Sequence, residues 1–82
     1  MESTLDIVYS VLRDNDGQFL SVREIRGLIF HEHFTTMNFE TIVKNIDRLK
    51  RLGHTVEETT ERRGKLKLPV KIFRLKPKTE TE

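Results

Sequence analysis

Three histidines are the side chains best suited to bind a metal ion. His31 and His33 are two residues apart, a spacing that puts them on different faces of a helix and on one face only of an extended segment. His54 lies far along the chain, and the sequence has no Cys to complete a ligand set. The sequence therefore predicts no metal site, and a solvated helix end is the better interpretation of residues 31–33.

The carboxylates are also poorly placed for acid–base catalysis. Asp14 and Asp16 belong to a helix-ending stretch, where Asp and Asn are expected for turn geometry alone. Glu57 and Glu58 are adjacent in a stretch with strand composition, so they point to opposite faces of a sheet. No Ser, His and Asp residues converge by spacing, and there is no glycine-rich phosphate loop. We expect neither an enzyme nor a cofactor.

The charges favour a different chemistry, the binding of a polyanion. The net charge is only +2, but residues 1–40 hold three basic and seven acidic side chains, whereas residues 41–82 hold twelve basic and six acidic ones. Residues 62–78 include eight basic side chains and no acidic one. This asymmetry favours a nucleic acid or another anionic partner, although lysines that guard a sheet edge would give the same pattern.

Three segments that carry apolar residues at helical spacing must position these charges. The predicted helices lie near residues 4–14, 21–33 and 38–52. Ser21 and Glu24 have the spacing of a capping box, which marks the start of the second helix. Asn38 is a good N-cap for the third helix, and Gly53 is suited to its end.

After Gly53 the pattern becomes that of a β-hairpin. A β-branched stretch, a turn signal at Arg62–Lys65 and a second strand from Val70 to Leu75 predict a hairpin over residues 55–75. Pro69 should lie at a strand start or at a sheet edge, because it cannot donate to a ladder. With a short extended stretch at residues 19–20, the predicted fold is α+β, in the order helix, strand, helix, helix, strand, strand. The expected core residues are Ile25, Leu28, Ile42, Ile46, Leu49, Val56, Phe73 and Leu75.

Length and composition limit the organisation of the chain. Eighty-two residues are enough for one domain, predicted over residues 1–75, followed by a disordered polar tail over residues 76–82. The absence of Cys rules out disulfides and fits a reducing compartment. The apolar runs are too short to span a bilayer, and the polar N-terminus does not look like a signal peptide. We expect a soluble protein of the cytoplasm, without a membrane partner.

Two stretches carry a resemblance to a known family. Residues 19–25 look like the start of the second helix, and residues 41–57 like the recognition helix and wing, of winged helix-turn-helix domains. Such domains open many bacterial transcription regulators of the DeoR-like and biotin-repressor-like kinds. The resemblance covers residues 4–75. It implies a small non-enzymatic protein that binds double-stranded DNA and regulates transcription.

In that reading the third helix enters the major groove, where Asn can read adenine and Arg can read guanine. The predicted recognition residues, expected on one exposed side of the helix, are Thr41, Lys44, Asn45, Arg48 and Arg51. The wing is expected to meet phosphates or the minor groove. Its predicted contact residues are Arg62, Arg63, Lys65, Lys67 and Lys71. The alternative is that the helix cations only solvate a surface.

The connection between the second and third helices favours a protein partner as the rival hypothesis. This stretch is apolar for a loop, and Phe and Met are enriched at protein interfaces. Its candidate contact residues are Phe30, Phe34, Met37 and Phe39. A protein-interaction adaptor, or an inhibitor of a transcription or replication complex, would use them in this way. Alternatively, two or three of these side chains fill the junction between the two helices.

Overall fold

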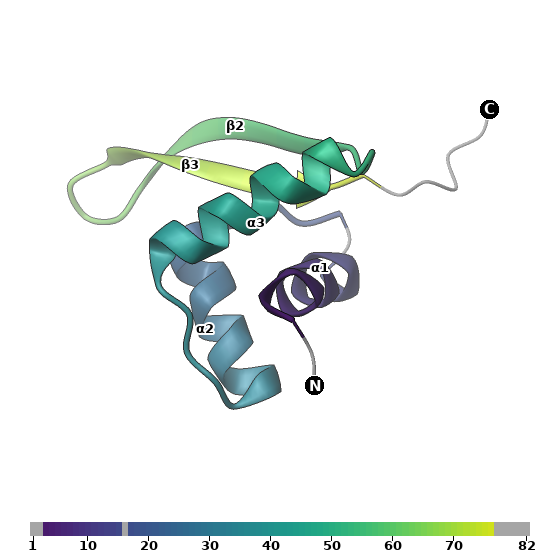
Figure 1. The fold of residues 1–82 in the computed structure, drawn as a ribbon. Helices are drawn as coiled ribbons and strands as arrows, with labels where there is room; N and C mark the ends of the chain where they lie inside the picture. The colour runs from purple at the N-terminus through teal and green to yellow at the C-terminus, as the bar shows by residue number, and fades with distance from the viewer. Residues whose placement is uncertain (1–2, 16, 77–82) are drawn as a thin grey trace.

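Three helices and three strands follow one another in the order that the sequence predicts. The computed structural model describes residues 3–15 and 17–76, with helices α1 (Thr4–Asp14), α2 (Val22–His33) and α3 (Phe39–Arg51). The strands β1 (Leu20–Ser21), β2 (Val56–Arg63) and β3 (Leu68–Leu75) form one antiparallel sheet (Figure 1). The fold is therefore α+β, as predicted. Apart from Lys76, the predicted tail lies outside the described residues.

Polar caps set the start of each helix. The hydroxyl of Ser21 accepts from the Glu24 N–H at 3.1 Å, and the Glu24 carboxylate accepts from the Ser21 N–H at 2.8 Å. The predicted capping box is thus confirmed. The Asn38 side chain caps α3 by accepting from the Thr41 N–H at 2.8 Å, again as predicted. Each cap satisfies a backbone donor that the first helical turn leaves without a partner.

The hairpin is regular from end to end. Its register runs without interruption from Val56 opposite Leu75 to Arg63 opposite Leu68. The second strand begins at Leu68 rather than at Val70, because the turn is confined to residues 64–67. β3 is the central strand, but β1 pairs only with its residues 72 and 73. Pro69 therefore lies near the strand start, beyond the reach of β1, as expected for a residue without an N–H.

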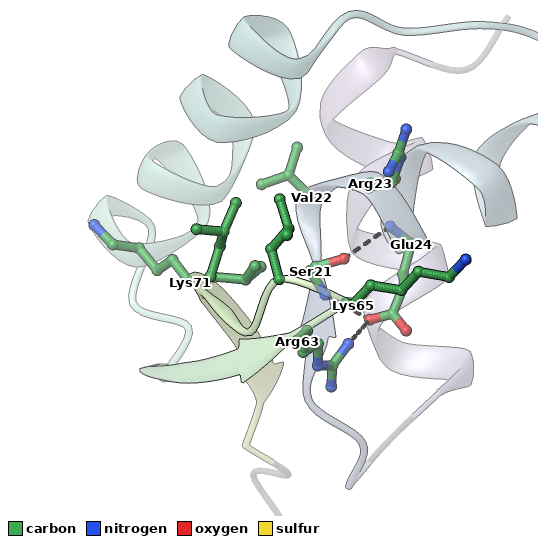
Figure 2. Close-up of a pocket in the computed structure, with 11 residues that line it drawn as sticks. Ser21, Val22, Arg23, Glu24, Arg63, Lys65 and Lys71 are labelled. Carbon is green, nitrogen blue, oxygen red and sulfur yellow. Dashed lines mark hydrogen bonds and ion pairs between the residues drawn. The ribbon is translucent and has the colours of Figure 1, made fainter.

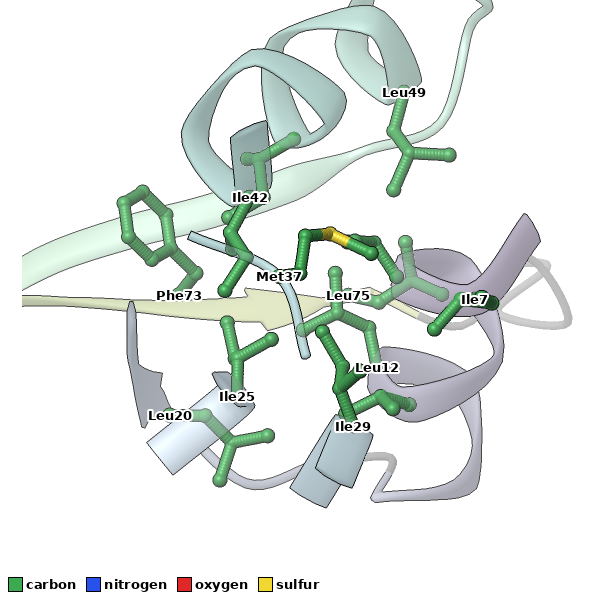
Figure 3. Packing of buried hydrophobic residues seen from close by; sticks show 13 residues of the cluster. Ile7, Leu12, Leu20, Ile25, Ile29, Met37, Ile42, Leu49, Phe73 and Leu75 are labelled. Carbon is green, nitrogen blue, oxygen red and sulfur yellow. The ribbon is translucent and has the colours of Figure 1, made fainter. Parts of the chain in front are cut away.

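One apolar cluster holds the helices against the sheet (Figure 3). Its buried members are Ile7, Val8, Val11, Leu12, Leu20, Ile25, Ile29, Met37, Ile42, Ile46, Leu49, Phe73 and Leu75. Of the predicted core, Leu28 and Val56 are only partly buried and pack against the cluster, and the other six residues are buried. The hairpin extends past the N-terminal end of α3, so its turn projects from this packed body (Figure 1).

Candidate nucleic-acid interface

Helix α3 exposes two neighbouring stripes of different character. Residues at i, i+3, i+7 and i+10 follow one line along a helix. The first line, the basic stripe, consists of Thr41, Lys44, Arg48 and Arg51. The second line, the acidic stripe, consists of Glu40, Val43 and Asp47. All of these residues are exposed except the half-buried Thr41, so α3 offers a polyanion three cations flanked by two carboxylates.

An ion pair shows which stripe lies nearer the sheet. Lys50 continues the line of the acidic stripe, and its Nζ lies 2.9 Å from Oε1 of Glu58 on β2. The acidic stripe therefore lies on the side of α3 that faces β2. The basic stripe lies on the other side of Glu40 and Asp47, farther from the hairpin. A duplex that contacts both the basic stripe and the hairpin must therefore lie across the surface that Glu40 and Asp47 occupy.

The prediction that Asn45 is exposed on α3 is wrong. Its side chain is only 3% exposed, and its amide Nδ2 donates to the carbonyl of Thr41 at 3.0 Å. The reason is its position, because Asn45 shares the buried line of α3 with Ile42, Ile46 and Leu49. An amide held in this way inside the protein is not available to an adenine edge. The spacing 42, 45, 46, 49 is the sequence signal that places Asn45 in the interior.

The hairpin tip (residues 62–67) holds cations in three different situations. Arg62 Nη1 donates to the Lys67 carbonyl at 3.1 Å, which closes the turn without neutralising the guanidinium. Arg63 lies 2.6 Å from both Glu61 and Glu24 and is therefore already paired. Lys65 and Lys67 are exposed and make no ion pair with a described residue. Lys71, outside the tip, lies 3.4 Å from Oε2 of Glu58.

Two carboxylates stay ionised and keep their cations paired. Burial raises the pKa of Glu24, but the bonds from the Ser21 N–H and from Arg63 outweigh it and hold that pKa below its ordinary value. The hydrogen bond from Lys50, helped by Lys71, lowers the pKa of Glu58. Both carboxylates are charged at neutral pH. They partly neutralise the cations bonded to them, which are Arg63, Lys50 and Lys71, and these cations therefore attract a polyanion less strongly.

The basic side chains therefore fall into two groups. Within residues 3–15 and 17–76, those in contact with a carboxylate are Arg13, Lys50, Arg63, Lys71 and Arg74. The others in the same ranges, which we call the unpaired cations, are Arg23, Arg26, Lys44, Arg48, Arg51, Arg62, Lys65, Lys67 and Lys76. All except Lys76 lie on α2, on α3 or at the hairpin tip.

Sequence reasoning missed the cations of α2. Arg23 and Arg26 are exposed on the helix, and the Arg26 guanidinium lies 5.4 Å from the centre of the Phe39 ring at the start of α3. The capping box at the start of α2 carried the information that would have placed these two arginines on the exposed surface. Once the capping box fixes the start of the helix, Ile25 and Ile29 define its buried line, and positions 23 and 26 fall outside it. The contact with Phe39 joins Arg26 to the N-terminal end of α3.

A cavity of about 630 Å³ separates the hairpin tip from the start of α2 (Figure 2). Its apolar lining is Val22, Leu66, Leu68 and Val70, and its charged lining includes Arg23, Lys65 and Lys71. The Arg63–Glu24 ion pair crosses from the hairpin to α2 at this place (Figure 2). This pair links the projecting turn to the helical body, and it therefore helps to orient Lys65 and Lys67.

The four apolar side chains around the connection between α2 and α3 match neither expectation completely. Met37 is 6% exposed and belongs to the core, so its predicted role as a partner contact is wrong. Phe34 is 86% exposed, and Phe30 and Phe39 are also exposed. The expectation that two or three of the four side chains fill the junction is therefore wrong as well. Phe34 is the C-cap of α2, and its backbone has the left-handed conformation (φ of 53°) that often ends a helix.

No protein-family model, no curated protein and no solved structure matches the chain. Among the described residues, no three His, Cys, Asp or Glu side chains are grouped so as to hold a metal ion, and His31 and His33 lie in the last turn of α2. No helix in the same ranges is long and apolar enough to cross a membrane. The winged-helix resemblance thus stays a prediction from the residues.

Proposed function

We propose that this protein is a winged helix-turn-helix protein that binds double-stranded DNA and regulates transcription. One observation supports this above all. Once the ion pairs are set aside, the cations that remain among residues 3–15 and 17–76 lie on α2, α3 and the hairpin tip, with the exception of Lys76. These are the elements that such a domain turns toward DNA, as helix-turn-helix and wing. The element order and the projecting hairpin fit the same proposal.

In this proposal α3 lies in the major groove, which is wide enough for a helix. Lys44 and Arg48 reach toward acceptor atoms of guanine, the most frequent partners of these side chains. Arg51, one turn further, meets the backbone. Glu40 and Asp47 face away from phosphates, where their charge would be unfavourable, or accept from the amino group of a cytosine. The two acids thereby restrict both the sequence and the orientation of the bound duplex.

The hairpin tip and α2 hold the duplex by its backbone. Lys65 and Lys67 project on the turn, and they meet phosphates beside the groove that α3 occupies. Arg23 and Arg26 meet phosphates on the strand next to the start of α2. Contacts of this kind carry no sequence information, but they supply most of the affinity and all of its steep dependence on salt.

The test compares an unpaired with a paired cation. We expect Lys65→Ala to weaken binding to every duplex alike and to reduce the slope of log K against log salt by about one unit, because one phosphate contact is lost. Arg13→Ala is the matched control, since it removes the same charge from α1, where Arg13 is paired with Asp14. Fluorescence anisotropy of a labelled duplex between about 50 and 200 mM salt measures both slopes. Equal slopes for the two variants would contradict the proposal.

A protein partner is the second candidate, and it rests on the exposed rings. Phe30, Phe34 and Phe39 leave large apolar surfaces in water around the end of α2 and the start of α3. Phe34 is the most exposed of them, although its left-handed backbone would be less strained with Gly or Asn. An adaptor or inhibitor would bury these rings against another protein. The absence of any duplex binding at low salt would favour this candidate.

A further inference from the structure

Strand β2 has one edge without a partner among the described elements. The sheet order is β1-β3-β2, so β2 is an outer strand, and its eight residues contain no proline and no bulge. The Lys76 N–H donates to the Thr55 carbonyl, which makes residues 55 and 76 a hydrogen-bonded pair. Such pairs alternate along an antiparallel ladder. Residues 57, 59, 61 and 63 therefore bond to β3, and residues 56, 58, 60 and 62 direct their N–H and C=O groups outward.

The charges along this edge are complementary to themselves. Glu57 and Glu58 precede Thr60 by three and two residues, and Arg62 and Arg63 follow it by two and three. In an antiparallel pair of two copies centred on Thr60, Glu58 lies opposite Arg62 of the second copy, and Glu57 lies opposite its Arg63. Opposite charges at directly facing positions stabilise a strand pair. Thr60 and Glu58 also belong to the outward-bonding set, as hydrogen bonds between the copies require.

Other registers lack this match. A pair centred on Thr59 puts Glu57 opposite Glu61 of the second copy. Pairs centred on Glu57, Glu58, Glu61 or Arg62 put the same charged residue opposite itself. Like charges at facing positions destabilise strand pairing. Charged edges protect natural sheets against pairing with arbitrary strands. For two copies of β2, the charges therefore favour the register centred on Thr60 over the others.

We propose that this protein forms a twofold dimer in which β2 pairs with β2 of a second copy, centred on Thr60. The two three-stranded sheets then become one continuous sheet, and no edge of β2 is left open. Arg62 is well placed for this role, because its guanidinium is bonded to the Lys67 carbonyl and forms no ion pair with a described carboxylate. Glu58 keeps its bonds to Lys50 and Lys71 and has lone pairs left for another donor. The proposal does not depend on DNA binding.

Two charge-reversal variants, measured separately and as a mixture, test the proposal directly. Arg62→Glu puts Glu opposite Glu in a homodimer, and Glu58→Arg puts Arg opposite Arg. Each variant alone should therefore associate at least about tenfold more weakly than the unmodified protein. An equal mixture restores Glu opposite Arg at both positions and should dimerise again. Glu32→Arg is the control, since it makes the same change on the exposed surface of α2 and should not affect dimerisation. Sedimentation equilibrium measures the association of the unmodified protein, the two variants, their mixture and the control.

Amide hydrogen exchange of the unmodified protein gives a second readout that needs no variant. At high protein concentration the N–H groups of residues 58, 60 and 62 should become protected, and on dilution they should lose this protection. The N–H groups of residues 57, 59, 61 and 63 should be protected at both concentrations, because they bond to β3. A protein that stays monomeric up to about 1 mM would overturn the proposal. Homodimers of Arg62→Glu as stable as those of the unmodified protein, or a mixture that does not dimerise, would also overturn it.

Discussion

Replacement of Ile46 by Ala is expected to lower the free energy of unfolding by about 2–5 kcal/mol. Ile46 is 1% exposed and lies on α3 within the cluster that joins the three helices to β3. The loss combines the removed apolar atoms with the cavity that they leave, because a packed interior relaxes only partly. A domain of this size has a total stability of about 5–15 kcal/mol, so the substitution unfolds a large part of the population under mild denaturation. Urea titration followed by circular dichroism measures the loss.

The control for Ile46→Ala lies three residues earlier on the same helix. Val43 is 40% exposed in the acidic stripe, so Val43→Ala should change the free energy of unfolding by about 0.5 kcal/mol or less. Both substitutions remove methyl or methylene groups from β-branched residues of α3, and their helix propensities change in the same direction. Similar losses for the two variants would mean that α3 does not pack through the line of Ile42, Ile46 and Leu49.

The second large effect is expected at the basic stripe. Arg48→Ala should cost about 1–3 kcal/mol of binding energy on a preferred duplex and reduce the discrimination between that duplex and others. The reason is that Arg48→Ala removes a bidentate contact with a guanine, which exists only on the preferred duplex. Loss of a phosphate contact would instead weaken binding to every sequence. Selection of duplexes from a random pool with the unmodified protein supplies the preferred sequence. Competition between preferred and unrelated duplexes then measures the discrimination.

Asn45→Ala is the informative comparison for Arg48→Ala. Because the Asn45 amide is bonded to the Thr41 carbonyl inside the protein, its removal should lower stability and leave discrimination unchanged. A loss of discrimination in Asn45→Ala equal to that in Arg48→Ala would show that the side chain leaves the interior and reaches the bases. A loss of affinity in Arg48→Ala that is uniform across sequences would show that the protein coats DNA without reading it.

Local signals in the sequence were enough to predict the elements. Capping residues at Ser21 and Asn38 place the starts of α2 and α3 to within one residue, because each cap satisfies a donor that only a helix start leaves open. The hairpin was predictable from its β-branched residues and its Gly64 turn. The start of β3 at Leu68 was not, because Leu68 and Pro69 are held by pairing with Arg63 and Arg62 rather than by their own preference.

The candidate site was less predictable, because it depends on contacts between distant segments. Arg63 and Glu24 are 39 residues apart, and nothing in either neighbourhood shows that they will pair. Asn45 was misplaced for a different reason. A polar residue next to Lys44 suggests an exposed face, but the phase of the helix is set by its apolar residues, and these turn Asn45 inward. The exposure of Phe34 was not predictable either, because an apolar residue type alone does not show whether its ring lies in the core or in water.

The most direct test of the proposed function is a titration of the ¹⁵N-labelled protein with duplex DNA at low salt, followed by amide chemical shifts. We expect shifts in residues 41–51 of α3 and in the hairpin tip, with smaller shifts near Arg23 and Arg26, and little change in α1. Addition of salt to about 0.5 M should reverse them, because the contacts are mainly to phosphates. No amide shift at low salt, or shifts confined to α1 or to residues 30–34, would contradict the proposed function.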